Sequence, residues 1–514
     1  MGTNATGTNA MGMGTGAMGA GMTAGSRPGA PAGSVRLTKG NRDRALMLRI
    51  LDNAMQLDYA LPWAHDRFSS ATTHANSIYT SMNPDTWDAN FLVAARKYLA
   101  EYRDPNLGVY PPESLANLER GRGFDVRRFG DSLYVTRLKG ETRLKVGDEI
   151  VRLGSRTVAQ EAYLGRFWLH DDLARPEGEA AEATGAAEAG RVHEREQWDL
   201  ALASAPSVTL ASGDTIELRW YPEPGAGCAE DATAAECASS AGLVGFAGDP
   251  EAHVLRVRFS DLDDPECLDG LLEALEDADE GGARIDGLVL DLRECGGEDF
   301  TALPELLCLC IDAKADLDEL LTREVRTNYS THNCERRASE LRYLAQLEAE
   351  EAPETAVPAT LGDLEAEAVT VEQMSGTRPV ETFGAPDELG EPPHVVEPRG
   401  SFPVAILTDT RTTGVAEHLA ACVKRLAGGP RGRCTLVGRP TAGSTVTENL
   451  CSLDIGDGFV FVYPISALES AAQDPRFSMG AGIEPHVYVP WTPESLTRDA
   501  DLDAALAVLA ERAR

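Results

Sequence analysis

The stretch Ile285-Asp-Gly-Leu-Val-Leu-Asp-Leu-Arg-Glu-Cys-Gly-Gly297 constrains the fold of this chain more than any other. Its apolar run, 287–290, is too short for a helix and predicts a buried strand of a parallel or mixed sheet. The pair Gly296-Gly297 then forces a sharp turn before the apolar helix expected over 302–311. A strand, a glycine turn and a helix leave backbone N–H groups exposed at a helix N-terminus, and such groups bind anions and oxyanions.

The composition limits the class of protein and its partners. The chain has 514 residues, of which 43% are hydrophobic, which is enough for two or three domains with their own cores. A net charge of −35 argues against nucleic acid and anionic membranes as partners. No run approaches the roughly 18 apolar residues of a membrane span, and no basic start followed by an apolar segment marks a secretory leader. The 10 cysteines lack regular spacing, which favours reduced thiols and a cytoplasmic location.

Changes in composition and periodicity divide the chain into segments. A Gly-, Ala- and Met-rich start predicts a disordered tail, and apolar residues at helical spacing after it predict a small helical segment. Alternating strands follow, interrupted by an Ala/Glu run, and then a Gly- and Ala-rich linker. The expected segments are a tail 1–33, a helical segment 34–118, a β-rich domain 119–225 with an insertion near 174–195, a linker 226–249, and an α/β core 250–514.

Within the core, predicted strands alternate with predicted helices, which implies a sheet with crossover connections. Strands are expected at 253–259, 287–290, 402–408, 435–438, 459–463 and 487–489, and helices at 267–278, 302–311, 414–427 and 502–513. Residues 313–400 are acidic and punctuated by prolines, with one helical piece at 334–349. We interpret them as an insertion that forms part of a lid.

The order of motifs in the core resembles the tail-specific, or carboxy-terminal processing, serine proteases. The resemblance is carried by Asp291-Leu-Arg-x-x-Gly-Gly297 after an apolar strand, by Thr412-Thr-Gly-Val-Ala-Glu417 opening a helix, and by the later segments Thr435 to Gly443 and Gly482 to Val489. It covers residues 250–510 best. The resemblance implies a crotonase-like α/β protease core that acts on unstructured peptide or protein C-termini.

A second resemblance concerns the β-rich domain. A strand, the segment Val146-Gly-Asp-Glu-Ile150 and a further strand ending in Gly154 resemble a PDZ domain, the module that this protease family carries before its core. PDZ domains bind extended peptides by adding a strand to a sheet edge. A small β-domain without a ligand is the alternative.

The catalytic positions that the resemblance implies are not kept in this chain. The family's nucleophilic serine stands three positions before a glutamate, and here the glutamate is Glu417 and the serine position is Gly414, which has no side chain. The family's lysine base maps onto Ser444, and a histidine that follows an Asp-Pro in many relatives maps onto Asn106. The implied oxyanion hole is Gly296, Gly297 and the N–H of Val415, while Asp291, Arg293 and Glu417 have supporting roles.

Other residues are candidates for the missing nucleophile. Thr412 and Thr413 directly precede Gly414, but threonine at a helix start more often caps the helix. Ser444 is a candidate for a displaced nucleophile, although a Thr-Ala-Gly-Ser-Thr loop is more often simply a turn. Cys295 is a candidate thiol nucleophile, although a buried, inert cysteine is the more common case. His418 follows Glu417 on the helix and is expected to point elsewhere, toward solvent. If the rest of the site were intact, Gly414→Ser would restore some turnover.

No metal or cofactor is expected. Cys308-Leu-Cys310 and His332-Asn-Cys334 have no second pair for zinc, and no phosphate-loop or dinucleotide fingerprint occurs. Two functions remain from the sequence, and the loss of the nucleophile favours the first: a pseudoenzyme that binds peptide C-termini with little or no hydrolysis. The alternative is an active serine-type endopeptidase that uses a nearby hydroxyl such as Thr413 or Ser444. A hydratase-like activity follows from fold analogy alone.

Overall fold

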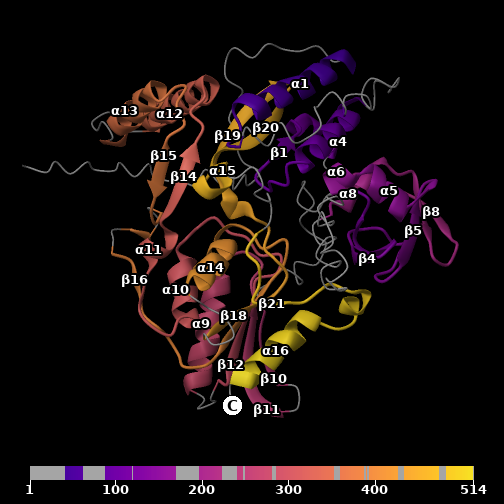
Figure 1. The fold of residues 1–514 in the computed structure, drawn as a ribbon, viewed down its shortest axis with the longest axis vertical. Helices are drawn as coiled ribbons and strands as arrows, with labels where there is room; N and C mark the ends of the chain where they lie inside the picture. Colours follow the sequence, from indigo (N-terminus) through magenta and orange to yellow (C-terminus); the bar gives the residue numbers. More distant parts are fainter. Residues whose placement is uncertain are drawn as a thin grey trace, which may run out of the picture.

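The computed structural model describes residues 41–61, 74, 87–118, 120–169, 196–222, 240–246, 249–280, 285–351, 359–386, 389–390, 393–426, 433–473 and 482–512. These residues form three packed units (Figure 1): a core sheet with helices on both faces, a second sheet beside the N-terminal helices, and a β-rich module. The expected tail and the Ala/Glu insertion lie outside the described residues.

The core is a six-stranded sheet in the order β10-β11-β12-β17-β18-β21. All neighbours pair in parallel except β10, which is antiparallel at one edge. The strands are β10 Ser240–Phe246, β11 Asp249–Arg258, β12 Gly287–Asp291, β17 Val404–Thr408, β18 Cys434–Gly438 and β21 Val487–Tyr488. The expectation of an α/β core with crossover connections is confirmed, and the narrower crotonase-like assignment stays a prediction.

Side-chain alternation along the central strands explains why both faces of this sheet are covered. Leu288 and Leu290 of β12 join a core with helices α9 Pro265–Glu280, α10 Ala302–Cys310 and α14 Gly414–Arg425. Val289, between them, points to the opposite face and packs with α16 Ala500–Arg512. Every residue of β12, β17 and β18 is buried, as a strand covered on both faces requires. Figure 1 shows α9, α10 and α14 on one side of the sheet and α16 on the other.

A second sheet has the order β1-β20-β14-β15, with β19 paired to β20. Helices α1 Asn41–Leu57 and α4 Trp87–Ala100 share a core with its long hairpin. The strands are β1 Gly108–Tyr110, β14 Arg323–Thr327, β15 Val380–Phe383, β19 Thr447–Gly456 and β20 Phe459–Leu468. The N-terminal helices therefore pack on a sheet whose longest strands come from the C-terminal quarter of the chain.

The segment expected to be an acidic insertion with a lid, 313–400, contributes directly to this second sheet. It contains α11 Leu317–Leu321, β14, α12 Thr331–Glu351, α13 Ala359–Gln373, β15 and a short pair β13 Ala315–Asp316 with β16 Val395–Val396. The helices α12 and α13 pack on each other around Ala338, Leu341 and Ala368 and stand at the end of the β14–β15 arm (Figure 1). Sequence analysis found one helix here and missed α13, β14 and β15.

The β-rich module is a six-stranded sheet, β3-β4-β5-β7-β8 with β6 beside β5, next to three short helices. Its elements are β3 Phe124–Phe129, β4 Ser132–Leu138, β5 Glu149–Leu153, β6 Arg156–Thr157, α5 Val158–Leu164, α6 Arg166–Leu169, α8 Trp198–Ser204, β7 Ser207–Leu210 and β8 Thr215–Glu217. Two strands were expected over 198–220, and the structure places α8 before them. The PDZ-like assignment of this module stays a prediction.

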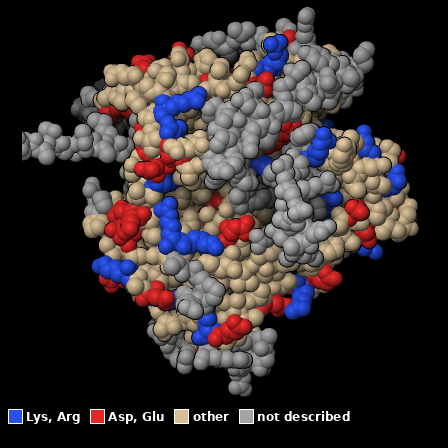
Figure 2. All heavy atoms as spheres, in the orientation of Figure 1, with Lys and Arg blue, Asp and Glu red and all other residues tan. Residues whose placement is uncertain are grey.

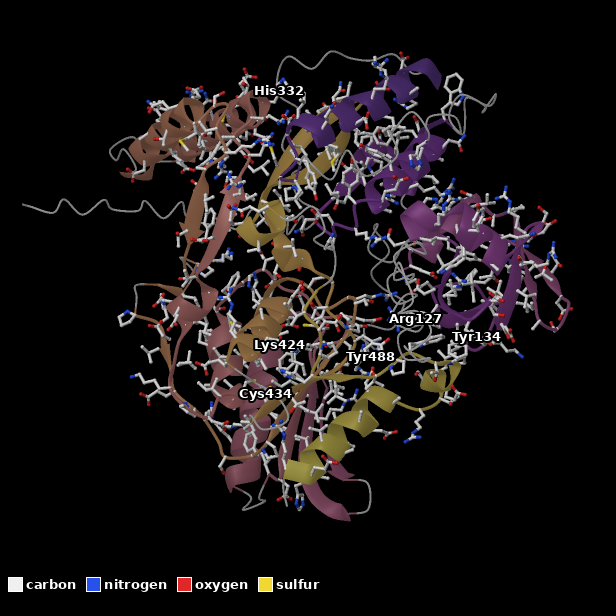
Figure 3. All side chains as sticks on the ribbon, in the orientation of Figure 1. Arg127, Tyr134, His332, Lys424, Cys434 and Tyr488 are labelled. Carbon is white, nitrogen blue, oxygen red and sulfur yellow. The ribbon has the colours of Figure 1, made fainter. Side chains whose placement is uncertain are left out.

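The module contacts the core through aromatic and charged side chains. Tyr134 and Arg127, labelled in Figure 3, lie toward Trp491 of the C-terminal segment, with a ring separation of 6.3 Å and a cation–ring distance of 5.8 Å. Arg137 of β4 pairs with Glu294 of the stretch that ends in the glycine turn. On the face shown in Figure 2, acidic and basic side chains lie side by side rather than forming a field of one sign.

Two further expectations need correction. The linker predicted at 226–249 contains β10, which pairs with β11 and closes the edge of the core sheet. The hairpin strand β19 was missed because its residues alternate in burial only weakly. None of the helices in the described part of the chain is long and apolar enough to cross a membrane.

Candidate functional site

Three loops meet at the carboxyl ends of the central strands, where parallel sheets commonly bind ligands. The glycine turn follows β12, the N-terminus of α14 follows β17, and the loop 441–444 follows β18. Gly297, Gly414 and Ser444 line one cleft of about 480 Å³. The residues that sequence analysis took from three separate segments are therefore neighbours.

The glycine turn contacts the start of α14 through its backbone. The N–H of Val415 donates to the carbonyl oxygen of Gly297 at 2.9 Å, and the N–H of Thr413 donates to Cys295 at 3.0 Å. Gly414 has a φ of +53°, and a Cβ added there would lie 2.0 Å from the Gly297 carbonyl oxygen. That carbonyl thus occupies the place of a nucleophile's side chain.

This contact corrects the expected oxyanion hole. The N–H of Val415 is satisfied by Gly297 rather than open to a ligand. The N–H of Gly414 is also engaged, because it donates to the hydroxyl oxygen of Ser444 at 3.0 Å. An oxyanion needs donors that point at the reacting centre, and these two donors point at acceptors of the chain itself.

Glu417 holds the loop after β18 against α14. Its side chain is fully buried, and its two oxygens accept four hydrogen bonds: from the Thr441 hydroxyl at 2.6 Å, the Gly443 N–H at 2.9 Å, the Ser444 N–H at 2.8 Å and the Ser444 hydroxyl at 2.6 Å. A carboxylate offers about four acceptor sites, so none is left for a substrate proton. These hydrogen bonds show that Glu417 fixes the position of the loop 441–444.

Ser444 is bonded on both sides within this arrangement. Its hydroxyl donates to Glu417 and its oxygen accepts from Gly414. The structure therefore does place a serine next to a proton acceptor, as an active displaced nucleophile would need. The acceptor is saturated, however, and the serine oxygen faces a backbone N–H instead of open space.

Asn106, at the position where relatives carry a histidine, joins the same group. Its side-chain amide donates to the carbonyl oxygens of Ser444 and Thr447, both at 2.8 Å. Asp104 lies beside it and accepts from the hydroxyls of Tyr59 and Thr447 at 2.8 and 3.0 Å. Burial raises the pKa of the Asp104 carboxyl above its ordinary value. A side-chain amide does not take up or release a proton near neutral pH, so Asn106 holds the loop by hydrogen bonds and cannot act as a base.

The remaining candidate nucleophiles differ from one another in their surroundings. Thr412 is fully buried, and its hydroxyl donates to Leu292 at 2.8 Å while accepting from the Asp409 N–H at 3.0 Å. Cys295 is buried, with its sulfur directed at the Gly296 carbonyl. Thr413 lines the cleft and stands at the N-cap of α14, yet its hydroxyl makes no capping hydrogen bond. The expected capping role of Thr413 is wrong, and no described base hydrogen-bonds to its hydroxyl.

Asp291 and Arg293, at the end of the central strand, belong to a buried ionic network. Asp291 accepts from Arg293 at 2.7 and 2.8 Å and from Arg256 at 2.7 Å. Arg293 continues to Asp499 and Asp501 at the start of α16. These arginines hold the pKa of the Asp291 carboxyl below its usual range, against the effect of burial. The network anchors the strand that precedes the glycine turn.

His418 is the cleft residue whose role sequence analysis misjudged. It lies one helical turn beyond Gly414, lines the cleft, and packs against Phe300 with ring centroids 5.0 Å apart. Burial, with smaller contributions from Arg323 and Arg425, lowers the pKa of its imidazole to about 3. It is therefore a neutral cleft residue and not the solvent-facing histidine that was expected.

This shift predicts a pH dependence of stability. In the unfolded chain His418 takes a proton near pH 6.5, whereas in the folded chain it does so only near pH 3. Stability is therefore present in full above about pH 6.5 and is lost as the pH falls toward 3. When the pH is lowered from 7 to 5.5, the unfolding free energy of the natural protein should fall by about 1 kcal/mol more than that of His418→Gln. Urea titrations at both pH values measure this, and equal losses would contradict it.

The insertion forms the far wall of the cleft. Arg337, Glu340 and Glu367 come from α12 and α13, and Phe383 comes from β15. Arg323 of β14 lies over the ring of Phe383 at 5.7 Å and pairs with Glu448 of β19. The apolar and charged lining beyond the glycine turn was not identified from the sequence, because it comes from elements that were missed or assigned to a lid.

The fold and this arrangement of loops define an α/β protein with a cleft between the core and an insertion. Residues 256–489 match the model of the peptidase family S41. The match confirms the resemblance to tail-specific proteases. No curated protein is significantly similar to the chain in sequence.

One of the solved structures similar to this chain supports the fold. Mature CPAF complexed with lactacystin matches with a TM-score of 0.52 and 15% identity, covering 92% of this chain and 98% of that chain. A further structure of mature CPAF gives a TM-score of 0.49 and 15% identity, with coverage of 92% and 96%. The photosystem II D1 C-terminal processing protease gives 0.38 and 16%, with coverage of 90% and 97%.

Proposed function

We propose that this protein binds unstructured peptide or protein C-termini in the cleft and does not hydrolyse them. The observation that carries the proposal is the Gly297 carbonyl, which bonds the Val415 N–H and fills the space where a side chain at 414 would stand. A peptidase needs a nucleophile and donors for the developing oxyanion at this place. Here the nucleophile's place is filled by the Gly297 carbonyl, and the N–H donors bond to groups of the chain itself. The cleft beside them is still open.

The positions of the family's base support the same conclusion. Asn106 and Ser444 are each held by hydrogen bonds to backbone or to Glu417 and carry no group that accepts a proton near neutral pH. Members of a catalytic unit act together, and the loss of a nucleophile alone typically costs on the order of 10⁶-fold in kcat. The lining combines the apolar side chains Phe300, Val371, Phe383 and Leu450 with paired charges, as suits an extended peptide.

Peptide binding is tested by fluorescence anisotropy with labelled, unstructured peptides that have free C-termini. Leu450 lines the cleft and is 39% exposed, and Leu426 lies outside the lining at 38% exposed, so the two leucines form a matched pair. Leu450→Glu should weaken binding about tenfold, because a carboxylate replaces an apolar contact, and Leu426→Glu should leave binding unchanged. Equal effects of both changes, or no binding by any peptide, would contradict the proposal.

One observation favours a second function, an active hydrolase with Ser444 as nucleophile. The Ser444 hydroxyl lies 2.6 Å from a Glu417 oxygen, within reach for proton transfer. A fluorophosphonate probe separates the two functions. We expect no labelling, whereas label on Ser444 that disappears in Ser444→Ala would establish the hydrolase. Label on Thr413 that disappears in Thr413→Ala would place the nucleophile at that neighbouring hydroxyl.

A further inference from the structure

The imidazole of His418 is an unused polar group in the wall of the cleft. It projects from α14 one turn beyond Gly414 and lines the cavity. Its ring packs on Phe300 at 54°, and no side chain or backbone group within the described ranges hydrogen-bonds to its nitrogens. A neutral imidazole offers one donor and one acceptor, so both are open to whatever enters the cleft.

One aromatic ring contacts this imidazole, and a second lines the same cleft. The ring of Phe300 packs against the imidazole. Phe383 lies under the guanidinium of Arg323, and the positive charge of Arg323 contributes to the lowered pKa of His418. Pro386 and Val415 also belong to the apolar part of the lining. Aromatic walls favour a flat ring as their ligand, through edge and offset-stacked contacts.

The charges near His418 disfavour an ionised ligand group. Arg323 and Arg425 both act on the imidazole as positive charges and would repel lysine or arginine. Arg323 forms an ion pair with Glu448, at 3.2 Å from its Nε, and that carboxylate would repel aspartate or glutamate. A neutral ring with a polar edge fits both conditions.

We propose that His418, Phe300 and Phe383 form a side-chain subsite that accepts a tyrosine of a bound peptide. The tyrosine ring packs between the phenylalanines, and its hydroxyl bonds an imidazole nitrogen. A phenylalanine would displace water from the imidazole without replacing the hydrogen bond, which loses affinity. The proposal rests on the proposed function, since it concerns the specificity of the same cleft.

The test uses labelled peptides of one sequence in which a single position is Tyr, Phe, Leu or Lys, with that position moved along the peptide. In the natural protein, we expect one position at which Tyr binds about tenfold tighter than Phe. His418→Phe should abolish this preference while leaving Phe and Leu peptides bound at least as tightly. His418→Gln keeps a donor and an acceptor and should restore part of the preference, which a merely structural role of His418 would not produce.

The outcomes separate this inference from the proposed function. Peptide binding with no Tyr-over-Phe preference, or a preference that survives in His418→Phe, would overturn the subsite and leave peptide binding intact. Absence of binding by every peptide would overturn both. Circular dichroism and thermal unfolding of the two variants establish that they fold, and binding of the Leu peptide by His418→Phe shows that its cleft is intact.

Discussion

Replacing Gly414 by serine is expected to give a less stable protein that still hydrolyses no peptide. The sequence alone suggested that this change would restore some turnover. In the structure Gly414 has a φ of +53°, and its new Cβ would lie 2.0 Å from the Gly297 carbonyl oxygen. A left-handed conformation with a side chain and a backbone clash together cost about 2 to 5 kcal/mol.

The matched control is Gly362→Ser in α13, where an added Cβ meets no atom within 4 Å. There the unfolding free energy should stay the same or rise slightly, because glycine is a poor helix former. Urea unfolding measures both variants, and hydrolysis of an unstructured protein measures activity. Turnover by Gly414→Ser would show that the glycine turn moves aside readily, and the account of the Gly297 carbonyl as a fixed occupant of this space would then be wrong.

Replacing Glu417 by alanine is expected to lower the free energy of unfolding by about 3 to 5 kcal/mol, since buried donors that lose their partner pay the full cost of desolvation. The carboxylate is fully buried, and it accepts hydrogen bonds from Thr441, Gly443 and Ser444. Its loss frees the loop after β18 and, through Ser444, the N–H of Gly414. Peptide binding should weaken together with stability.

Glu273, exposed on α9, provides the control for this change. Glu273→Ala should alter the unfolding free energy by less than about 0.5 kcal/mol. Glu417→Gln, which keeps one acceptor oxygen and the shape of the side chain, should fall between the two. If Glu417→Ala proved as stable as Glu273→Ala, the loop would be held by other contacts and the account of the site would be wrong.

Periodicity alone located most of the core sheet. The all-buried strands β12, β17 and β18 are continuous apolar runs, and a strand covered on both faces needs such a run whatever its neighbours are. The helices α14 and α16 follow from apolar residues at helical spacing. These elements depend on local pattern, which is why the sequence reveals them.

The elements that were missed depend on distant partners. The strands β14 and β15 pair with each other across more than fifty residues, and β14 also pairs with β20, about 140 residues away in sequence. The acidic segment 313–400 contains no local pattern that predicts its strands in the second sheet. The helix α8 begins at Trp198, in a stretch whose alternation suggested strands, and its burial against the β-rich sheet decides the conformation.

The sequence by itself determined that Gly414, Ser444 and Asn106 stand at the three positions to which the family resemblance assigns catalytic residues, because residue identity needs no coordinates. The tertiary structure decided what those replacements do. Only packing could show that the Gly297 carbonyl takes the vacant space, that Glu417 is saturated by four donors, and that His418 faces the cleft. Hydrogen bonds form between groups that folding brings together, and the spacing of residues along the chain does not specify which groups these are.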